Sequence, residues 1–283
     1  MNTSCPIRNP QSAIRNPNSP IGIFDSGVGG LTLFKSIKNI LPNEKLIYFG
    51  DTARLPYGTK SPEVIRKFSL QIAYFLERFG IKTLVVACHT ASSTALPDLK
   101  IKMKMPVVGV IEPAVKKAIN TTKNKNIGII ATKTTIESGS YQTLIQKADP
   151  MVSITTIAAP LLVPLVEEGW LNKGPTRDIL KEYVSPLKEK QIDTLILGCT
   201  HYPLLKHLFL EELGSSVTLV DTSLETAIYL QDLLKVNSLL NNSAISPDYS
   251  FYVSDDPEKF SKLARSFLGE KLETVKLVTL EEY

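Results

Sequence analysis

The sequence is short of cysteine and of long apolar runs, and each shortage excludes a class of protein. Its 283 residues contain three cysteines, widely spaced and without a Cys-x-x-Cys pair, which argues against a disulfide framework or a zinc ribbon. No stretch approaches the ~20 apolar residues that a membrane helix needs. The N-terminus lacks the basic-then-apolar pattern of a secretory signal. We therefore expect a reduced, cytoplasmic protein with no membrane partner.

The sequence also lacks a large excess of charge of either sign. The formal net charge is only +4, and Lys and Arg are spread along the chain rather than gathered into a basic block. Nucleic-acid-binding proteins usually carry such a block, so we expect no nucleic-acid partner. Hydrophobic residues make up 43% and charged residues 21% of the chain. This is an ordinary globular composition, and the length suits about two domains.

The first 20 residues differ from the rest of the chain. The run Ile-Arg-Asn-Pro occurs at residues 7–10 and again at 14–17, four prolines lie in the segment, and no apolar period is present. These features predict a disordered tail over residues 1–20. Cys5 lies in this tail and is assigned no role.

From residue 21 onward, short apolar runs alternate with segments of helical period. The expected strands are Ile21–Phe24, Leu46–Phe49, Thr83–Ala87, Val107–Val110, Ile127–Ile130, Ile154–Ala158, Thr194–Leu197 and Val217–Val220. The expected helices include Ser61–Phe79, Glu112–Asn120, Thr135–Lys147 and Thr176–Glu189. Parallel strands need crossover helices, so the pattern predicts an α/β fold with mainly parallel central sheets.

The strands fall into two batches, which predicts two similar domains with an active site in the cleft between them. We expect residues 21–112 plus 222–283 to form the first domain and residues 113–221 to form the second. The last segment begins with Thr-Ser-Leu-Glu at residues 222–225, a capping box that opens a helix. We expect this segment to return to the first domain.

Two of the strands end in the same way. Residues 84–90 read Leu-Val-Val-Ala-Cys-His-Thr and residues 195–201 read Leu-Ile-Leu-Gly-Cys-Thr-His, which places Cys88 and Cys199 111 residues apart. A cysteine between a strand and a helix faces helix N-terminal amides, whose field favours the thiolate. Two thiols facing one carbon can invert it, because one thiolate removes the α-proton while the opposite thiol supplies another. No cofactor is needed for this exchange.

Other interpretations of these residues stay open. Buried cysteines often only fill a core. His89 and His201 stand beside the two cysteines, so a zinc site is conceivable, although neighbours at a strand end point to opposite sides. The glycine-rich turn at residues 22–30 could cradle a phosphate, but Asp25 at its tip would repel one. Asp25 suits an ammonium group, a proton relay near a thiol, or a simple turn.

Six short motifs in order carry a specific resemblance. They are Asp25-Ser26-Gly27, Pro56-Tyr57-Gly58, Cys88-x-Thr90, Thr132-x-x-Thr135, Glu167 in a Pro-Leu-Val-Glu-Glu-Gly run, and Cys199-Thr200-His201. The set resembles the glutamate racemase family and spans residues 21 to about 230. The resemblance implies cofactor-independent interconversion of L- and D-glutamate, no metal, a homodimer in many members, and a product used in peptidoglycan synthesis.

The resemblance also implies a role for each matching residue. Cys88 would be the base for D-glutamate and Cys199 the base for L-glutamate. Asp25 would support Cys88, while Glu167 and His201 would support Cys199. The implied substrate contacts are Ser26, Pro56, Tyr57, Gly58, His89, Thr90, Thr132, Thr135 and Thr200.

His89 is a departure, since the family usually has Asn at this place. An imidazole titrates near neutral pH, so we expect altered substrate affinity and a pH profile that is steeper on the alkaline side. Two alternatives remain at this point. One is an aspartate racemase, which shares the two-cysteine logic. The other is an amino-acid-binding protein without activity, which would need Asp25 and the threonines but not both thiols.

Overall fold

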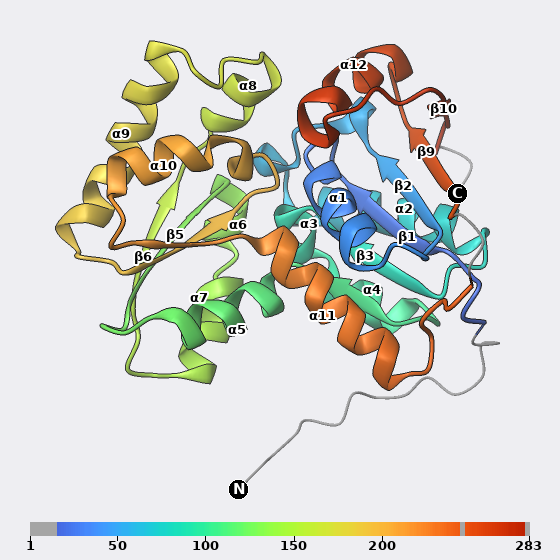
Figure 1. The fold of residues 1–283 in the computed structure, drawn as a ribbon, viewed down its shortest axis with the longest axis horizontal. Coiled ribbons are helices and arrows are strands. Elements are labelled where there is room, and N and C mark those ends of the chain that lie inside the picture. The colour runs from blue at the N-terminus through green and yellow to red at the C-terminus, as the bar shows by residue number, and fades with distance from the viewer. Residues whose placement is uncertain (1–15, 244–246, 281–283) are drawn as a thin grey trace, which may run out of the picture.

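The computed structural model describes residues 16–243 and 247–280 and contains two parallel sheets that lie side by side (Figure 1). The first sheet has six strands in the order β10-β9-β2-β1-β3-β4, and every neighbouring pair is parallel. Its strands are β1 (Ile21–Asp25), β2 (Leu46–Gly50), β3 (Thr83–Val86), β4 (Val107–Gly109), β9 (Tyr249–Val253) and β10 (Lys276–Leu277).

The second sheet has four strands in the order β6-β5-β7-β8, again all parallel. They are β5 (Asn126–Ala131), β6 (Ser153–Ala158), β7 (Thr194–Gly198) and β8 (Thr218–Val220). Each of the eight expected strands is present, with its ends within one residue of the prediction. The α/β class with parallel sheets is therefore confirmed. Buried parallel strands form nearly continuous apolar runs, which is why the sequence revealed them.

Helices cover both sheets. They are α1 (Leu31–Ile40), α2 (Pro62–Glu77), α3 (His89–Thr94), α4 (Leu96–Lys102), α5 (Ile111–Thr121), α6 (Lys133–Glu137), α7 (Ser140–Ala148), α8 (Leu162–Glu167), α9 (Gly174–Glu189), α10 (Lys206–Leu213), α11 (Thr222–Val236) and α12 (Pro257–Leu268), with 3-10 turns at η1 (Thr52–Arg54), η2 (Tyr57–Thr59) and η3 (Tyr202–Leu205).

Two helix predictions are wrong in detail. The helix expected over Thr135–Lys147 is divided into α6 and α7, because Gly139 adopts a left-handed conformation (φ 65°) that ends one helix before the next begins. The cap of α11 is also displaced by one residue. The side chain of Asp221, not that of Thr222, accepts hydrogen bonds from the amides of Ser223 and Leu224.

The chain passes from the first sheet to the second through α5 and comes back through α11. These two helices pack against each other where the halves meet, and α11 also packs on α1 of the first half (Figure 1). The last segment then adds β9 beside β2, so the expected return to the first sheet is confirmed. We propose that the domains divide after residues 112 and 221, although the first boundary falls inside the first turn of α5. One buried cluster includes side chains from β1 and β5, so the halves share a core.

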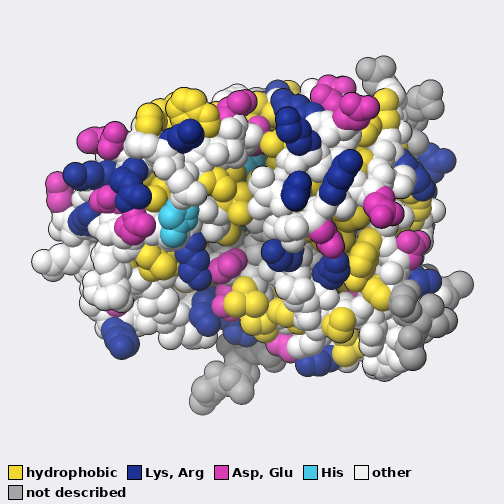
Figure 2. All heavy atoms as spheres, turned by 45° about the horizontal axis from the view of Figure 1, so that its top comes forward, with side chains coloured by type: hydrophobic (Ala, Val, Ile, Leu, Met, Phe, Trp, Pro, Cys, Tyr) yellow, Lys and Arg dark blue, Asp and Glu magenta, His cyan; other side chains and the backbone are white. Residues whose placement is uncertain are grey.

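The predicted tail over residues 1–20 falls largely outside the described residues, and so does Cys5. No helix in the described ranges is long and apolar enough to cross a membrane. Figure 2 shows one face of the molecule, on which Lys and Arg side chains are interspersed with Asp and Glu.

Candidate active site

The two cysteines occupy equivalent places in the two halves. Cys88 lies two residues after β3, and Cys199 lies directly after β7. Both are free thiols and each is only 6% exposed. The charge of Cys199 contributes to raising the pKa of Cys88, an effect that works only over short distances in a protein. The strand ends of both sheets therefore bring the two thiols into one site, as the sequence predicts.

The surroundings of Cys88 keep it protonated. Its Sγ lies 3.7 Å from the hydroxyl of Ser26. Burial, and then the nearby carboxylate of Asp25, raise the pKa of Cys88 to about 12, outweighing the amide of Ala91 and the Ser26 hydroxyl, which favour the thiolate. The expectation that helix amides would favour a thiolate here is wrong in its net result. The amide of α3 lowers the pKa of Cys88 by less than burial and the Asp25 carboxylate raise it.

Asp25 is itself fully buried at the end of β1. One carboxylate oxygen accepts the amide of Gly27 at 3.0 Å, and the other has no hydrogen-bond partner within the described residues. Burial raises the pKa of Asp25, while the charge of His201 and the amides of the following turn lower it. The charge of Asp25 thus acts both on Cys88 of its own half and on His201 of the other.

Cys199 has a different partner. Its Sγ lies 3.8 Å from Nδ1 of His201, and Nε2 of the same ring lies 3.0 Å from a carboxylate oxygen of Glu167 at the end of α8. Burial is the largest single influence on the His201 pKa and lowers it. The hydrogen bonds and charges of Cys199 and Glu167 together outweigh it and raise the pKa to about 10. His201 is therefore an imidazolium at neutral pH, placed between the sulfur of Cys199 and the carboxylate of Glu167.

Three of the predicted threonines form a triangle that bridges the two halves. The hydroxyl of Thr90 in α3 lies 3.0 Å from that of Thr132 and 3.3 Å from that of Thr135. Thr132 and Thr135 lie 2.9 Å apart, and Thr132 caps α6. A group of three hydroxyls can offer several donors to a carboxylate without adding a competing acid.

The predicted Pro56-Tyr57-Gly58 loop is held by residues that the sequence analysis missed. Buried Asp51 accepts a hydrogen bond from the Tyr57 hydroxyl, one from the Arg54 guanidinium at 2.8 Å, and one from the Ser254 hydroxyl at 2.8 Å. The Tyr57 hydroxyl is thus already bound. Asp51 follows β2 directly, at the same edge of the sheet where Asp25 ends β1, and this position could have identified it.

His89 does not behave as its sequence position suggests. The ring is 2% exposed, lies nearly parallel to Tyr141 with 6.4 Å between centroids, and has no hydrogen-bond partner for either nitrogen within the described ranges. Burial lowers the pKa of His89 to about 3. The predicted titration near neutral pH is therefore wrong, and with it the steeper alkaline limb. The altered substrate affinity stays a prediction.

Thr200 and His201 press against the backbone of the first half at Gly29. A Cβ on Gly29 would lie 2.3 Å from the Thr200 hydroxyl and 2.5 Å from two atoms of the His201 ring. Thr32 of α1 also reaches the carbonyl of Thr200, at 3.3 Å. Glycine at position 29 is thus what allows this side of the second half to sit close to α1.

Gly29→Ala is therefore expected to displace the His201 ring. For the racemisation that the resemblance implies, a misplacement of about 1 Å lowers turnover by about 100-fold, and initial rates with the two enantiomers of the implied substrate would measure it. Gly174→Ala is the matched control, because a Cβ there meets nothing within 4 Å. Equal rates for the Gly29 and Gly174 variants would contradict the close approach described here.

In the part of the chain that the structure describes, no three His, Cys, Asp or Glu side chains form a group that could hold a metal ion. The zinc interpretation of Cys88, His89, Cys199 and His201 would need such a group. His207, the remaining histidine, lies exposed on α10 and contacts Asn172.

Comparison with known proteins gives this arrangement a family. A family model described as Asp/Glu/Hydantoin racemase matches residues 21–227. The chain belongs to this racemase family. A glutamate racemase of Geobacter metallireducens is 48% identical over 265 residues, covering 94% of this chain and 98% of that protein. Every predicted catalytic residue lies inside the matched region.

Solved structures of racemases share the fold. A glutamate racemase isoform from Bacillus anthracis superposes with a TM-score of 0.91 at 38% identity, covering 94% of this chain and 99% of that chain. The glutamate racemase of Francisella tularensis in complex with D-glutamate gives 0.89 at 41% identity, covering 94% and 100%. The two-domain racemase fold is thus shared with these structures.

Proposed function

We propose that this protein interconverts L- and D-glutamate without a cofactor, using Cys88 and Cys199 as bases on opposite faces of the α-carbon. The observation that carries the proposal is the pairing of two buried thiols from equivalent strand ends, each with its own acidic or imidazole partner. The glutamate racemases that resemble the chain over nearly its full length support glutamate as the substrate.

The two thiols begin the reaction in different states. With L-glutamate, Cys199 as thiolate removes the α-proton, and the imidazolium of His201, held by Glu167, stabilises the negative sulfur. Cys88, which its surroundings keep as a thiol, gives its proton to the opposite face of the carbanion. One proton has been taken and one given, so Cys199 ends as the thiol and Cys88 as the thiolate. Asp25 supports Cys88 in regaining a proton.

The remaining predicted residues are proposed to hold the substrate. Developing negative charge at the α-carbon and its carboxylate needs donors that are already in place. The hydroxyl triangle and Thr200 can supply these donors, while Asp51 fixes the Tyr57 loop. The proposed contacts are Ser26, Pro56, Tyr57, Gly58, His89, Thr90, Thr132, Thr135 and Thr200.

We also propose, on the strength of the resemblance to glutamate racemases, that the product serves peptidoglycan synthesis in the cytoplasm and that the protein works as a homodimer. Sedimentation of the purified chain with and without D-glutamate would test the dimer directly.

The reaction is tested by incubating L-glutamate in heavy water. Two opposed bases predict that D-glutamate appears with deuterium at the α-carbon while the remaining L-glutamate still carries hydrogen, because the proton removed by one thiol is not the one returned by the other. A D-product that kept its hydrogen would contradict the two-base proposal. Turnover of aspartate alone would establish the aspartate alternative, and binding without exchange would establish the amino-acid-binding alternative.

A further inference from the structure

The imidazole of His201 contacts an aromatic side chain that comes from the far end of the chain. Phe267 of α12 meets the ring in an edge-to-face arrangement, with 5.6 Å between centroids and 88° between planes. Phe267 is 4% exposed. It belongs to the first half, whereas His201 belongs to the second, and it lies 40 residues beyond the region that the family model matches.

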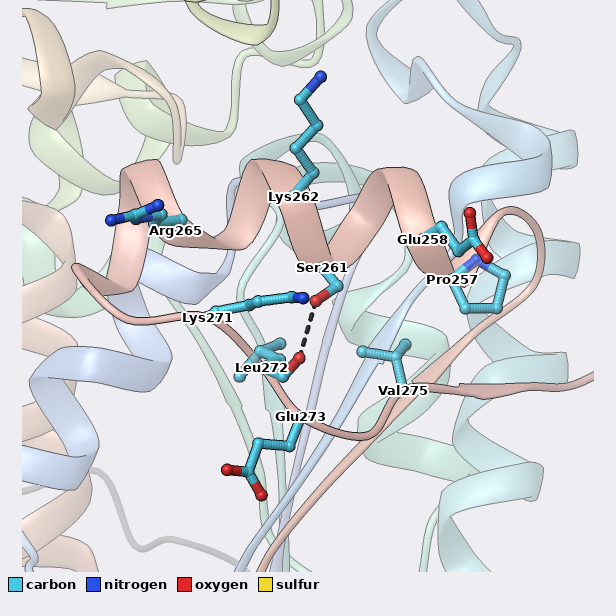
Figure 3. Close-up of a pocket in the computed structure, with 9 residues that line it drawn as sticks. All are labelled: Pro257, Glu258, Ser261, Lys262, Arg265, Lys271, Leu272, Glu273 and Val275. Atoms are coloured by element: carbon cyan, nitrogen blue, oxygen red, sulfur yellow. Dashed lines mark hydrogen bonds between the residues drawn. The ribbon is translucent and has the colours of Figure 1, made fainter.

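Helix α12 is built to hold this phenyl ring in place. Asp256 caps it by accepting the amide of Lys259 at 2.9 Å, and Gly269 ends it in a left-handed conformation. One face of the helix is buried, whereas its outer face carries charged residues along a groove of about 570 Å³ (Figure 3). Across that groove the Ser261 hydroxyl donates to the carbonyl of Leu272 at 2.8 Å. The inner face, from which Phe267 projects, is fixed on the core.

The hydrogen bonds of His201 do not by themselves fix its ring. The contact to the Cys199 sulfur is long at 3.8 Å, and Glu167, the partner at the other nitrogen, is 25% exposed on its side chain. Rotation of the ring would separate both nitrogens from their partners at once. The backbone of Gly29 limits the ring on one side, and the phenyl ring of Phe267 packs against the imidazole, which is 4% exposed.

We propose that Phe267 is a positioning residue, which holds the His201 imidazole in line between Cys199 and Glu167 and thereby serves proton transfer at Cys199, the thiol that His201 contacts. The proposal rests on the proposed racemisation. It assigns a task in the active site to the C-terminal helix, which lies beyond the region that the family model matches.

A racemase imposes a constraint that makes the test specific. Its substrate and product are mirror images with equal free energy, so kcat/KM must be the same in both directions for every variant. A defect confined to Cys199 therefore cannot appear as a one-sided loss of kcat/KM. It appears in the isotope effects, because deuterium on L-glutamate is removed by Cys199 and deuterium on D-glutamate is removed by Cys88.

Phe267→Ala is expected to lower kcat/KM by about 10–100-fold in both directions, as a displaced catalytic group does. The isotope effect on kcat/KM with α-deuterated L-glutamate should rise, because proton removal by Cys199 becomes more fully rate-limiting. The isotope effect with α-deuterated D-glutamate should fall, because proton removal by Cys88 then limits the rate less. Phe267→Leu, which keeps an apolar side chain against the ring, should lie between the wild type and Phe267→Ala.

Leu268→Ala is the matched control. Leu268 is a buried neighbour on the same turn of α12, so its truncation loosens the helix in a similar way without removing the ring at His201. It should lower the melting temperature yet leave the ratio of the two isotope effects unchanged. Equal changes of both isotope effects in Phe267→Ala, or the same shift of the ratio in Leu268→Ala, would overturn the proposal.

Failure of the proposed function gives a different result, namely no racemisation by the wild type. The position of the ring can then still be followed by NMR, since the chain has only three histidines and the His201 signals are identified by their loss in His201→Asn. The imidazole N–H protons should be protected from solvent in the wild type and in Leu268→Ala, and should broaden in Phe267→Ala. Unchanged protection in Phe267→Ala would overturn the positioning role.

Discussion

Cys199→Ala is expected to slow racemisation by about 10²–10⁴-fold, because a positioned acid or base contributes that much to a proton transfer. The same loss is expected for Cys88→Ala. The two variants should differ in the half-reaction that they retain. Cys199→Ala keeps the base for D-glutamate and should slowly exchange the α-proton of that enantiomer with heavy water. Cys88→Ala should do so only with L-glutamate. Proton NMR of the α-carbon signal measures both.

The matched control is Cys5→Ala, which makes the same substitution at the cysteine that has no assigned role. It should racemise at the wild-type rate. Full activity in either Cys88→Ala or Cys199→Ala would rule out the two-base mechanism. Exchange of both enantiomers by one single-cysteine variant would instead show that one thiol reaches both faces of the carbon.

The two strand ends could be predicted because the signal is local. Each cysteine follows an apolar run of strand length, and such runs remain recognisable whatever they pack against. Both runs became central strands, with β3 beside β1 and β7 beside β5. Parallel strands align their carboxyl ends, so the strand pattern alone brought Cys88 and Cys199 to matching positions.

The C-terminal helix had start and stop signals that the sequence analysis did not use. Asp256 and Pro257 stand at its beginning and Gly269 at its end. Its contribution to the site was not predictable even so. Phe267 meets His201 across 66 residues and between two halves of the molecule, and no local pattern specifies such a contact.

The protonation states were not predictable for a related reason. Cys88 stands before a helix in the sequence, which favours an ordinary or lowered pKa for its thiol. His89 is a histidine, whose imidazole ordinarily titrates near neutral pH. Burial decides otherwise at both positions, raising the pKa of Cys88 to about 12 and lowering that of His89 to about 3. Desolvation depends on the packing of the whole core, which only the structure supplies.

His89→Asn is expected to make the protein more resistant to acid. In the unfolded chain an imidazole takes up a proton below about pH 6.5, but in the folded protein burial delays this until about pH 3. Between these pH values the unfolded state binds more protons than the folded state. The free energy of unfolding is therefore highest above pH 6.5 and decreases as the pH falls below it. The loss is about 1.4 kcal/mol for each pH unit, and asparagine, which does not titrate, removes it.

Urea unfolding at pH 7.5, 6.0 and 5.0 would measure this difference. Any cost of burying the asparagine amide is the same at each pH, so the informative quantity is the slope and not the offset. The free energy of unfolding of the variant, relative to the wild type, should be about 2 kcal/mol higher at pH 5 than at pH 7.5. His207→Asn is the control, because it makes the same substitution at an imidazole that is exposed on α10. Parallel stability curves for the wild type and His89→Asn would show that His89 is protonated inside the fold, and that its two nitrogens are paired after all.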